Sequence, residues 1–406
     1  MFCGGCFRDN ALVAALRQLG HATTMVPLYL EQKSGFFRNS PKWLHRLLDS
    51  PGLLNLAAGS AAKTRPEDVG ELTLSMARGE NGFQARELEE LIAWLKQNEH
   101  PDVICLSNAL LIGMARRIKS ELRAPVLCML QGEDWFLDAL PTAQREQTWA
   151  TLIERARDID LFIAPSRYFA AVMSARLKLR ADQIQVIYNG ISLTGYTTAA
   201  SPPNPPVLGY FSRMSQIKGL DTLVEAFIHL KTRDRVKDLK LRVGGGMSPA
   251  DEKFVGTLRE RMKAHGCLKD AEFHPNLDRA AKVDFFRSLS VMSAPALYGE
   301  AFGLYVIESL AAGVPVVQPR HAAFPELIAA TGGGVLCEPN DPLALALAIE
   351  ELLLDPERLR ALGQAGRAAV LEKFSAERMA RDIAQAYQTV ASRSRSDNAS
   401  IFNSQF

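Results

Sequence analysis

The 406-residue sequence is poor in the features that mark membrane, secreted and nucleic-acid-binding proteins. Six cysteines are too few for a disulfide scaffold in a chain of this length. No apolar run approaches the ~18 residues that a membrane-spanning helix needs, and residues 1–30 lack a basic start followed by an apolar centre. Lysine and arginine (47) exceed aspartate and glutamate (45) by only two, so the net charge indicates no nucleic-acid partner. We therefore expect a cytoplasmic protein.

A proline-rich stretch separates two arrays of alternating strands and helices. Residues 201–206 hold four prolines, which cannot continue a helix or a central strand, so we interpret this stretch as a stiff linker. Compact apolar runs without alternation are typical of strands that are buried on both faces of a parallel sheet. The predicted strands are 101–106, 125–130, 161–164 and 184–188 before the linker, and 207–211, 239–243, 290–294 and 314–317 after it.

This pattern predicts an α/β protein with two doubly wound, Rossmann-like domains that face each other across a cleft. Apolar residues make up 47% of the chain, so either half can build its own core. We assign 1–200 to the first domain, 201–206 to the linker and 207–375 to the second domain. The polar, serine-rich residues 391–406 are expected to form a disordered tail.

The amino terminus departs from this pattern. Gly4 and Gly5 lead into an amphipathic stretch that we expect to be a helix capped by Asp9 or Asn10. In a doubly wound domain such a glycine turn follows the first strand. Only three residues precede Gly4, and a strand needs ~5. We therefore expect that the given sequence begins after its first strand, which the intact mass of the natural protein would test.

Two glutamates eight residues apart flank a glycine-containing turn. Glu300 lies beside Gly299 and Gly303, and Glu308 lies about one turn inside the helix expected to follow. Glycines let backbone N–H groups approach an anion at a helix amino terminus, and carboxylates beside it can accept hydrogen bonds from sugar hydroxyls. Taken alone, however, this spacing is more often produced by one capping and one solvated glutamate.

Two cations follow the first strand of the second domain. Arg213 ends this strand and Lys218 begins the next helix, so both are expected at the carboxyl edge of the sheet, where open α/β sheets bind ligands. A guanidinium and an ammonium together can neutralise a diphosphate. Two solvated loop cations would show the same pattern. The expected helix has one apolar face: Leu220, Leu223, Val224, Phe227 and Leu230.

Taken in order, these features resemble the glycosyltransferase family 4 (group 1) enzymes of the GT-B fold, over most of the chain. The ordered set is far more specific than any one of its members. It comprises the Gly4-Gly5 turn, GlyHisAlaThrThrMetVal (20–26), AlaProSer (164–166), IleTyrAsnGlyIleSer (187–192), the Arg213/Lys218 segment, the Glu300/Glu308 block and GlyGlyValLeuCysGluProAsnAsp (333–341).

The resemblance implies a role for each matching charged residue. Arg213 and Lys218 match the cations that hold the diphosphate of a nucleotide-sugar donor. Glu308 matches the carboxylate that binds the donor ribose, and Glu300 the one that contacts hydroxyls of the transferred sugar. Arg213, Lys218 and Glu300 are therefore the expected catalytic residues.

Backbone groups are implied as well. Phe302, Gly303 and Leu304 match a turn whose amides face the phosphate or the sugar. Gly5, with Gly4 as its neighbour, matches a turn of the amino domain that closes over the donor. By the same resemblance, a helix at 376–390 is expected to cross back to the amino domain.

One departure concerns the acceptor side. Many members carry His-Gly or His-Asp after the amino-domain strand at 125–130, whereas this chain has Gln131-Gly132-Glu133-Asp134. Gln131 can replace only the hydrogen bonding of that histidine, not its acid–base chemistry. We take Gln131, Glu133 and Asp134 as the candidate acceptor-side residues.

The resemblance implies a retaining glycosyltransferase that needs no metal and moves a sugar from a nucleoside-diphosphate sugar to a glycan, a lipid-linked acceptor or a small molecule. Attack from the face of the leaving group would need no enzymic base, whereas double displacement would need a nucleophile such as Glu133, Asp134 or Glu300. A GT-B epimerase or phosphorylase, or a non-catalytic sugar-nucleotide-binding protein, remains an alternative function.

Three further motifs favour structural interpretations. Cys3-x-x-Cys6 lacks the second pair that a zinc site needs. The Asp158-x-Asp160 motif precedes a strand, away from the expected ligand edge. Gly244–Gly246 follows a strand but lacks the third glycine of a dinucleotide-binding turn, which argues against a nicotinamide site and leaves open that the run lines the donor cleft.

Residues 31–65 combine basic and aromatic side chains. This composition suits contact with an anionic membrane at the inner face, or with a lipid-linked acceptor. A helical insertion that packs its aromatics inward is the favoured alternative.

Overall fold

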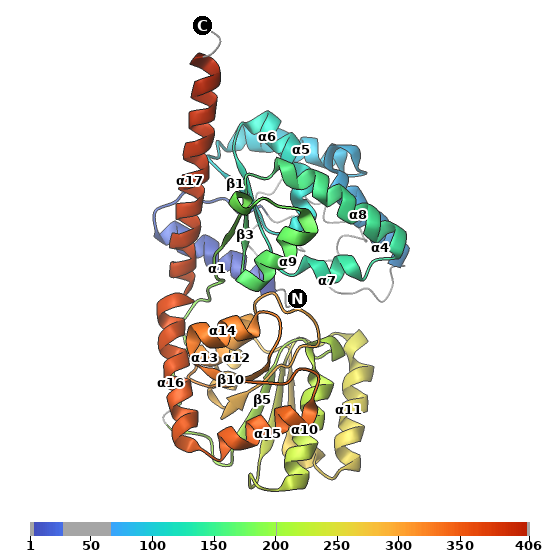
Figure 1. The fold of residues 1–406 in the computed structure, drawn as a ribbon, viewed down its shortest axis with the longest axis vertical. Coiled ribbons are helices and arrows are strands. Elements are labelled where there is room, and N and C mark those ends of the chain that lie inside the picture. Colours follow the sequence, from blue (N-terminus) through green and yellow to red (C-terminus); the bar gives the residue numbers. More distant parts are fainter. Residues whose placement is uncertain (1–3, 27–65, 200, 404–406) are drawn as a thin grey trace. The chain divides into compact units, whose positions relative to one another are not determined.

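The computed structural model describes residues 4–26, 66–199 and 201–403 (Figure 1). The chain divides into two compact units. Of the described residues, Gly4 and those within Asn189–Arg378 form the carboxyl unit, and those within Gly5–Tyr188 and from Met379 onward form the amino unit. The basic and aromatic stretch at 31–65 lies outside the described residues.

The amino unit is built on one parallel sheet. Within the described residues the sheet has four strands in the order β1-β2-β3-β4. Their bounds are β1 Ile104–Leu106, β2 Val126–Met129, β3 Leu161–Ala164 and β4 Ile184–Val186. The α-helices are α1 Gly4–Gln18, α4 Pro66–Arg78, α5 Ala85–Asn98, α6 Ala115–Leu122, α7 Glu133–Asp138, α8 Thr142–Arg155 and α9 Arg167–Leu177. The 3₁₀ turns are η3 Gly79–Asn81, η4 Ala109–Met114, η5 Ala156–Asp158 and η6 Ala181–Gln183.

The carboxyl unit is built on a second parallel sheet, of six strands in the order β10-β9-β8-β5-β6-β7. Its strands are β5 Val207–Phe211, β6 Lys240–Gly245, β7 Ala271–Pro275, β8 Val291–Met292, β9 Val316–Pro319 and β10 Gly334–Cys337. The α-helices are α10 Leu220–Arg233, α11 Glu252–Ala264, α12 Arg279–Arg287, α13 Leu304–Ala311, α14 Phe324–Thr331, α15 Pro342–Leu353 and α16 Pro356–Lys373. The 3₁₀ turns are η7 Gln216–Lys218, η8 Pro249–Asp251 and η9 Leu268–Asp270.

These two sheets confirm the predicted fold class of two Rossmann-like α/β domains. The strands expected from apolar runs are present, and the predicted apolar face of α10 is buried. β7 and β10 were not predicted. Both form edges of the sheet and are only partly buried, so neither has the compact apolar run that marks a central strand.

Two expectations for the chain ends need correction. Helix α1 already begins at Gly4, so Gly4 and Gly5 lie in its first turn rather than before it, and the expected caps Asp9 and Asn10 lie inside the helix. Helix α17 runs from Ala376 to Asn403, through most of the stretch expected to be disordered. Residues 391–403 contain no glycine or proline that would end a helix.

Helix α17 starts in the carboxyl unit and belongs to the amino unit from Met379 onward. In the amino unit, the Tyr387 hydroxyl hydrogen bonds with the thiol of Cys105, which lies in β1. None of the helices in the described ranges is both long and apolar enough to cross a bilayer.

Candidate functional site

In the carboxyl unit, loops from neighbouring strands meet at the carboxyl edge of the sheet. β9, β8, β5 and β6 are adjacent and parallel, so the loops that follow them lie side by side. The loop after β5 lies against the loop after β8 at Gly219, where a Cβ atom would stand 1.9 Å from the Pro295 carbonyl oxygen. The loop after β9 is joined by a hydrogen bond of 3.2 Å from the Ala323 N–H to the Glu300 carbonyl. This edge is where ligands bind in open α/β sheets.

Lys218 and Glu300 form the centre of this edge. The Lys218 Nζ atom lies 2.8 Å from Glu300 Oε2, and both side chains are largely buried, with 20% and 11% exposed. Lys218 also hydrogen bonds to the Tyr298 hydroxyl and stands 4.6 Å from the centre of the Tyr298 ring. Lys218 and Glu300 were predicted from the sequence, whereas Tyr298 was not, because no local signal marks it.

The charges of this pair stabilise each other. Burial alone would lower the pKa of Lys218, but the Glu300 carboxylate and Tyr298 raise it above its ordinary value. Burial alone would raise the pKa of Glu300, but the Lys218 ammonium and a hydrogen bond from Tyr305 lower it. The Tyr305 hydroxyl lies 3.2 Å from Glu300 Oε2. Both groups are therefore charged at neutral pH.

The predicted amide turn lies directly after Glu300. Gly303 has φ +92° and precedes α13, so the turn uses a conformation that favours glycine. The Phe302 N–H hydrogen bonds to the Glu300 carboxylate, while the Phe302 ring is buried and its centroid lies 6.2 Å from that of Phe374. Leu304 is the first residue of α13. The turn therefore brings a helix amino terminus next to the Lys218–Glu300 pair.

Arg213 stands on the same edge with a different partner. Its backbone carbonyl accepts a hydrogen bond of 2.7 Å from the Tyr210 hydroxyl, which fixes the loop after β5. Its guanidinium lies 3.3 Å from Asp251, and 47% of the side chain is exposed. Ser248 donates to the same Asp251 carboxylate through its N–H and its hydroxyl. Arg213 is thus tethered at the rim and open to a ligand.

Glu308 projects from α13 and pairs with a residue that sequence reasoning missed. Lys282, on α12, forms an ion pair of 2.5 Å with the Glu308 carboxylate, and both side chains are mostly buried. Burial is the largest cause that raises the pKa of the Tyr196 hydroxyl, and the negative charge of the nearby Glu308 is the second. Glu308 is therefore neither an exposed helical residue nor part of the Lys218 pair.

In the amino unit, Gln131, Glu133 and Asp134 follow β2 at the carboxyl edge of the sheet. Glu133 is 6% exposed, and its two carboxylate oxygens accept backbone N–H groups of Ala109, Gln131 and Gly132 at 2.8–2.9 Å. This geometry fits a structural role for Glu133, as the residue that fixes the loop. The Gln131 side-chain amide donates to the Ser107 carbonyl.

Asp134 is placed differently from Glu133. Its Oδ1 atom is shielded from solvent and has no hydrogen-bond partner. Burial, the largest cause, raises the pKa of Asp134, and the negative charge of Glu133 adds to this effect. Gly5 belongs to the amino unit as well, and its role toward the donor stays a prediction.

The motifs that favoured structural interpretations have structural contacts. Asp160 accepts hydrogen bonds from Lys119 Nζ at 2.7 Å and the Val126 N–H at 2.8 Å. Asp158 pairs with Arg116 at 3.1 Å. Gly245 has φ +125°, and a Cβ atom there would stand 1.8 Å from the Ser212 carbonyl oxygen. Over the described ranges, no group of three or more His, Cys, Asp or Glu side chains is arranged to hold a metal ion.

Both halves of the chain match known protein families. Residues 198–369 match the family Glycosyl transferases group 1, and residues 11–194 match Glycosyltransferase Family 4. The chain belongs to the group 1, family 4 glycosyltransferases. The first match contains the Lys218–Glu300 pair, Arg213 and Glu308, and the second contains Gln131 and Asp134.

Curated relatives within this glycosyltransferase family cover part of the chain. A D-inositol 3-phosphate glycosyltransferase of Xylanimonas cellulosilytica is 29% identical over 229 residues, which is 52% of each chain. The Corynebacterium jeikeium protein of the same name is 30% identical over 165 residues, 40% of this chain and 39% of its own. The chain thus spans about half the length or less of these relatives.

Solved structures show the same glycosyltransferase fold. Sucrose-phosphate synthase from Thermosynechococcus elongatus superposes with a TM-score of 0.64 at 22% identity, over 78% of this chain and 82% of its own. The Anabaena protein HepE, solved in complex with UDP, has a TM-score of 0.64 at 19% identity, over 77% of this chain and 84% of its own. These structures belong to the GT-B glycosyltransferases, which confirms the fold that the resemblance implied.

Proposed function

We propose that the protein transfers a sugar from a nucleoside-diphosphate sugar to an acceptor, with retention of anomeric configuration and without a metal ion. The observation that carries this proposal is the Lys218–Tyr298–Glu300 network at the carboxyl edge of the sheet. It places a buried ammonium and a buried carboxylate within hydrogen-bond distance of each other, beside the start of α13.

The cations would act on the leaving group. When the anomeric bond breaks, negative charge grows on the departing nucleoside diphosphate. Lys218, the exposed guanidinium of Arg213 and the amides at the start of α13 are suited to stabilise this charge, which is the role a metal ion plays in other transferases. Because these groups are fixed before the reaction, they need no reorganisation in the transition state.

The two glutamates would orient the donor. Glu300 is held charged by Lys218, so it can accept hydrogen bonds from hydroxyls of the transferred sugar. Glu308 is held by Lys282 and would accept hydrogen bonds from the donor ribose. We propose that the acceptor hydroxyl attacks from the face of the leaving group, whose phosphate oxygen takes the proton.

Turnover of UDP-glucose is the first test, because HepE was solved with UDP-glucose. Release of UDP that requires an acceptor supports transfer and contradicts the epimerase, phosphorylase and binding-protein alternatives.

NMR of the product shows whether the configuration is retained. Unchanged turnover in EDTA supports metal independence, and loss of turnover that Mg²⁺ restores contradicts it. Trapping a glycosyl-enzyme with a slow donor would overturn same-face attack.

We also propose that the protein works in the cytoplasm, with residues 31–65 contacting the inner face of the membrane. The support is compositional, from the basic and aromatic side chains of this segment. Flotation with liposomes that contain or lack anionic lipid tests the contact. Flotation that does not depend on anionic lipid would contradict it.

A further inference from the structure

The Lys282–Glu308 ion pair lies at the carboxyl edge of the sheet in the carboxyl unit. Lys282 is the fourth residue of α12 and Glu308 the fifth residue of α13, two helices that follow β7 and β8. A helix that follows a parallel strand starts at the carboxyl edge of the sheet, so both residues belong to the edge that holds Lys218 and Glu300. The Lys282 Nζ atom lies 2.5 Å from Glu308 Oε1, and both side chains are mostly buried.

A second element restricts the Glu308 carboxylate. Burial raises the pKa of Tyr196, and the charge of Glu308 adds to this effect, so the two groups are close. The Tyr196 carbonyl accepts a hydrogen bond of 3.2 Å from Arg367, which also donates to the carbonyl of Ala311 at the end of α13. The carboxylate is therefore contacted by Lys282 of α12 and approached by a loop that is tied to its own helix.

Packing of the two helices does not depend on this ion pair. Helix α12 buries Val283, Phe285 and Phe286, and α13 buries most of its apolar residues. Replacing a buried ion pair by apolar residues is often neutral or stabilising, so stability alone does not account for two buried charges at this place. A role toward a ligand does, because the pair lies at the edge where open α/β sheets bind ligands.

The ion pair fixes the direction of the Glu308 carboxylate. The terminal torsion of a glutamate is soft, so an unpaired carboxylate turns between several orientations. Lys282 contacts Oε1, which leaves Oε2 to accept a hydrogen bond from another donor. A ribose presents two neighbouring hydroxyl groups, whereas a deoxyribose presents only one. An acceptor held in one direction gains a hydrogen bond from the ribose hydroxyl that it faces and loses this bond with the deoxy sugar.

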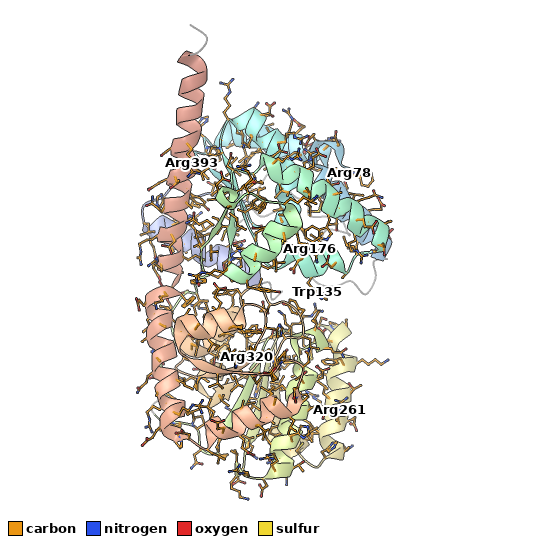
Figure 2. All side chains as sticks on the ribbon, in the orientation of Figure 1. Arg78, Trp135, Arg176, Arg261, Arg320 and Arg393 are labelled. Carbon is orange, nitrogen blue, oxygen red and sulfur yellow. The ribbon has the colours of Figure 1, made fainter. Side chains whose placement is uncertain are left out.

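Lys282 is the cation that serves Glu308. One turn earlier on α12, Arg279 is engaged by the loop 192–194, to whose carbonyl groups it donates at 3.3 Å. Arg320 is exposed in the loop after β9 (Figure 2). Among the residues that the structure describes, Glu308 forms an ion pair with Lys282 and with no other cation. Removal of the Lys282 ammonium therefore leaves this carboxylate without a charged partner.

We propose that Lys282 is a positioning residue for the donor: it directs Glu308 Oε2 toward a ribose hydroxyl, and the pair thereby selects ribonucleotide donors over deoxyribonucleotide ones. This rests on the proposed transfer function, in which Glu308 binds the donor ribose, and adds the residue on which the selectivity depends. Lys282 acts through Glu308, so its effect vanishes when Glu308 is replaced.

Nucleotide binding to the full chain, measured by calorimetry, tests the proposal. The probes are UDP, GDP and ADP, each with its 2′-deoxy and 3′-deoxy forms. The selectivity is the ratio of Kd between the more weakly bound deoxy form and its parent. The variants are Lys282→Met, Lys282→Arg, Glu308→Gln and the double variant Lys282→Met/Glu308→Gln. Thermal unfolding shows that each variant is folded, and Lys282→Gln replaces Lys282→Met if the latter does not fold.

Two control variants remove ion pairs elsewhere in the carboxyl unit. Lys231→Met is the matched control, because Lys231 of α10 forms an ion pair of 2.8 Å and similar burial with Asp270. Arg261→Met removes a surface pair with Glu225, and Arg261 lies on α11, which is well apart from α12 and α13 (Figure 2). These controls show what the loss of an ion pair does by itself.

We expect the wild type to bind its preferred ribonucleotide at least about tenfold more tightly than the more weakly bound deoxy form. The selectivity should fall to about threefold or less in Lys282→Met and in Glu308→Gln, and the double variant should match Glu308→Gln. Lys282→Arg should retain most of the selectivity because it keeps a cation beside the carboxylate, and both controls should retain all of it.

Four results would each overturn the proposal: wild-type selectivity in the folded Lys282→Met or Lys282→Gln variant, an equal loss in Lys231→Met, no rescue by Lys282→Arg, or a further loss from Glu308→Gln to the double variant. Equal binding of ribonucleotides and deoxyribonucleotides by the wild type overturns it as well. Acceptor-dependent turnover of UDP-glucose alongside any of these results refutes the role of Lys282 alone. If the wild type binds none of the nucleotides, the transfer function is refuted too.

Discussion

Replacing Lys218 by methionine should reduce both stability and turnover, for two separable reasons. The substitution keeps the apolar stem but leaves Glu300, whose side chain is 11% exposed, as a buried carboxylate without its cation. Removing one partner of a buried pair costs about 3–5 kcal/mol, and the remaining exposure and the hydrogen bond from Tyr305 favour the lower end of this range. Glu300→Gln should destabilise similarly, since it leaves the Lys218 ammonium unpaired.

The double variant Lys218→Met/Glu300→Gln separates stability from catalysis. With both charges removed, no unpaired ion stays buried, so we expect the unfolding free energy to recover to within about 1 kcal/mol of the wild type. Turnover should not recover. Loss of one charged contact to the transition state typically costs about 3–4 kcal/mol, or roughly a hundred- to thousandfold in rate.

Thermal unfolding and donor turnover of the four proteins test this reasoning. Glu300 has a lowered pKa, so its contribution is present above the ordinary glutamate range near 4.3 and is lost as the pH falls further. Lys218 has a raised pKa, so its contribution is complete below about pH 10 and is lost only at higher pH. The stability differences should therefore be constant from about pH 6 to 9. A double variant no more stable than either single variant, or wild-type turnover in Lys218→Met, would refute the assignment.

Three further outcomes are expected. Arg213→Ala should lower turnover by about two to three orders of magnitude with little change in melting temperature, because its side chain is 47% exposed; parallel loss of both would point to a structural role. Asp134→Asn should stabilise the protein near neutral pH. Burial raises the pKa of Asp134, so the wild-type protein loses stability as the pH rises above the ordinary aspartate range, and the variant does not. A gain in stability that is equal at pH 4 and pH 8 would contradict this. Gly219→Ala should lower the free energy of unfolding by about 2 kcal/mol or more, because φ is +72° and the new methyl group would stand 1.9 Å from the Pro295 carbonyl oxygen. Gly256→Ala, on an open helix face, is the control and should be neutral or stabilising in the same thermal unfolding measurement.

Much of the fold could be predicted because buried strands are continuous apolar runs in the sequence. A central parallel strand is apolar along its whole length, so β3 and β5 were predicted at their observed bounds. The edge strand β7 holds only partly buried and exposed residues, so it lacks a continuous apolar run. Helix α17 is longer than the predicted helix at 376–390, because a polar composition does not by itself end a helix that lacks glycine and proline.

The chemistry of the site divides in the same way. Arg213, Lys218, Glu300 and Glu308 could be selected from the sequence because the ordered set of motifs that contains them resembles the glycosyltransferase family 4 enzymes. Each motif taken alone was compatible with ordinary solvated side chains. The partners of these residues could not be selected in this way, because pairing depends on which strands are adjacent. β5 lies next to β8 in the sheet, and this order brings the loops that hold Lys218 and Glu300 together across 82 residues of sequence.

What the sequence alone determined, then, was the alternation of elements and the residue types at the carboxyl edges of the strands. The tertiary structure decided which of those residues are buried and what neutralises them, because strand order and helix packing are set by the whole core. It made Lys218 a buried partner of Glu300, left Arg213 exposed at the rim, and left an Asp134 oxygen without a partner. None of these differences is visible in the local sequence, where all three are charged residues beside a strand end.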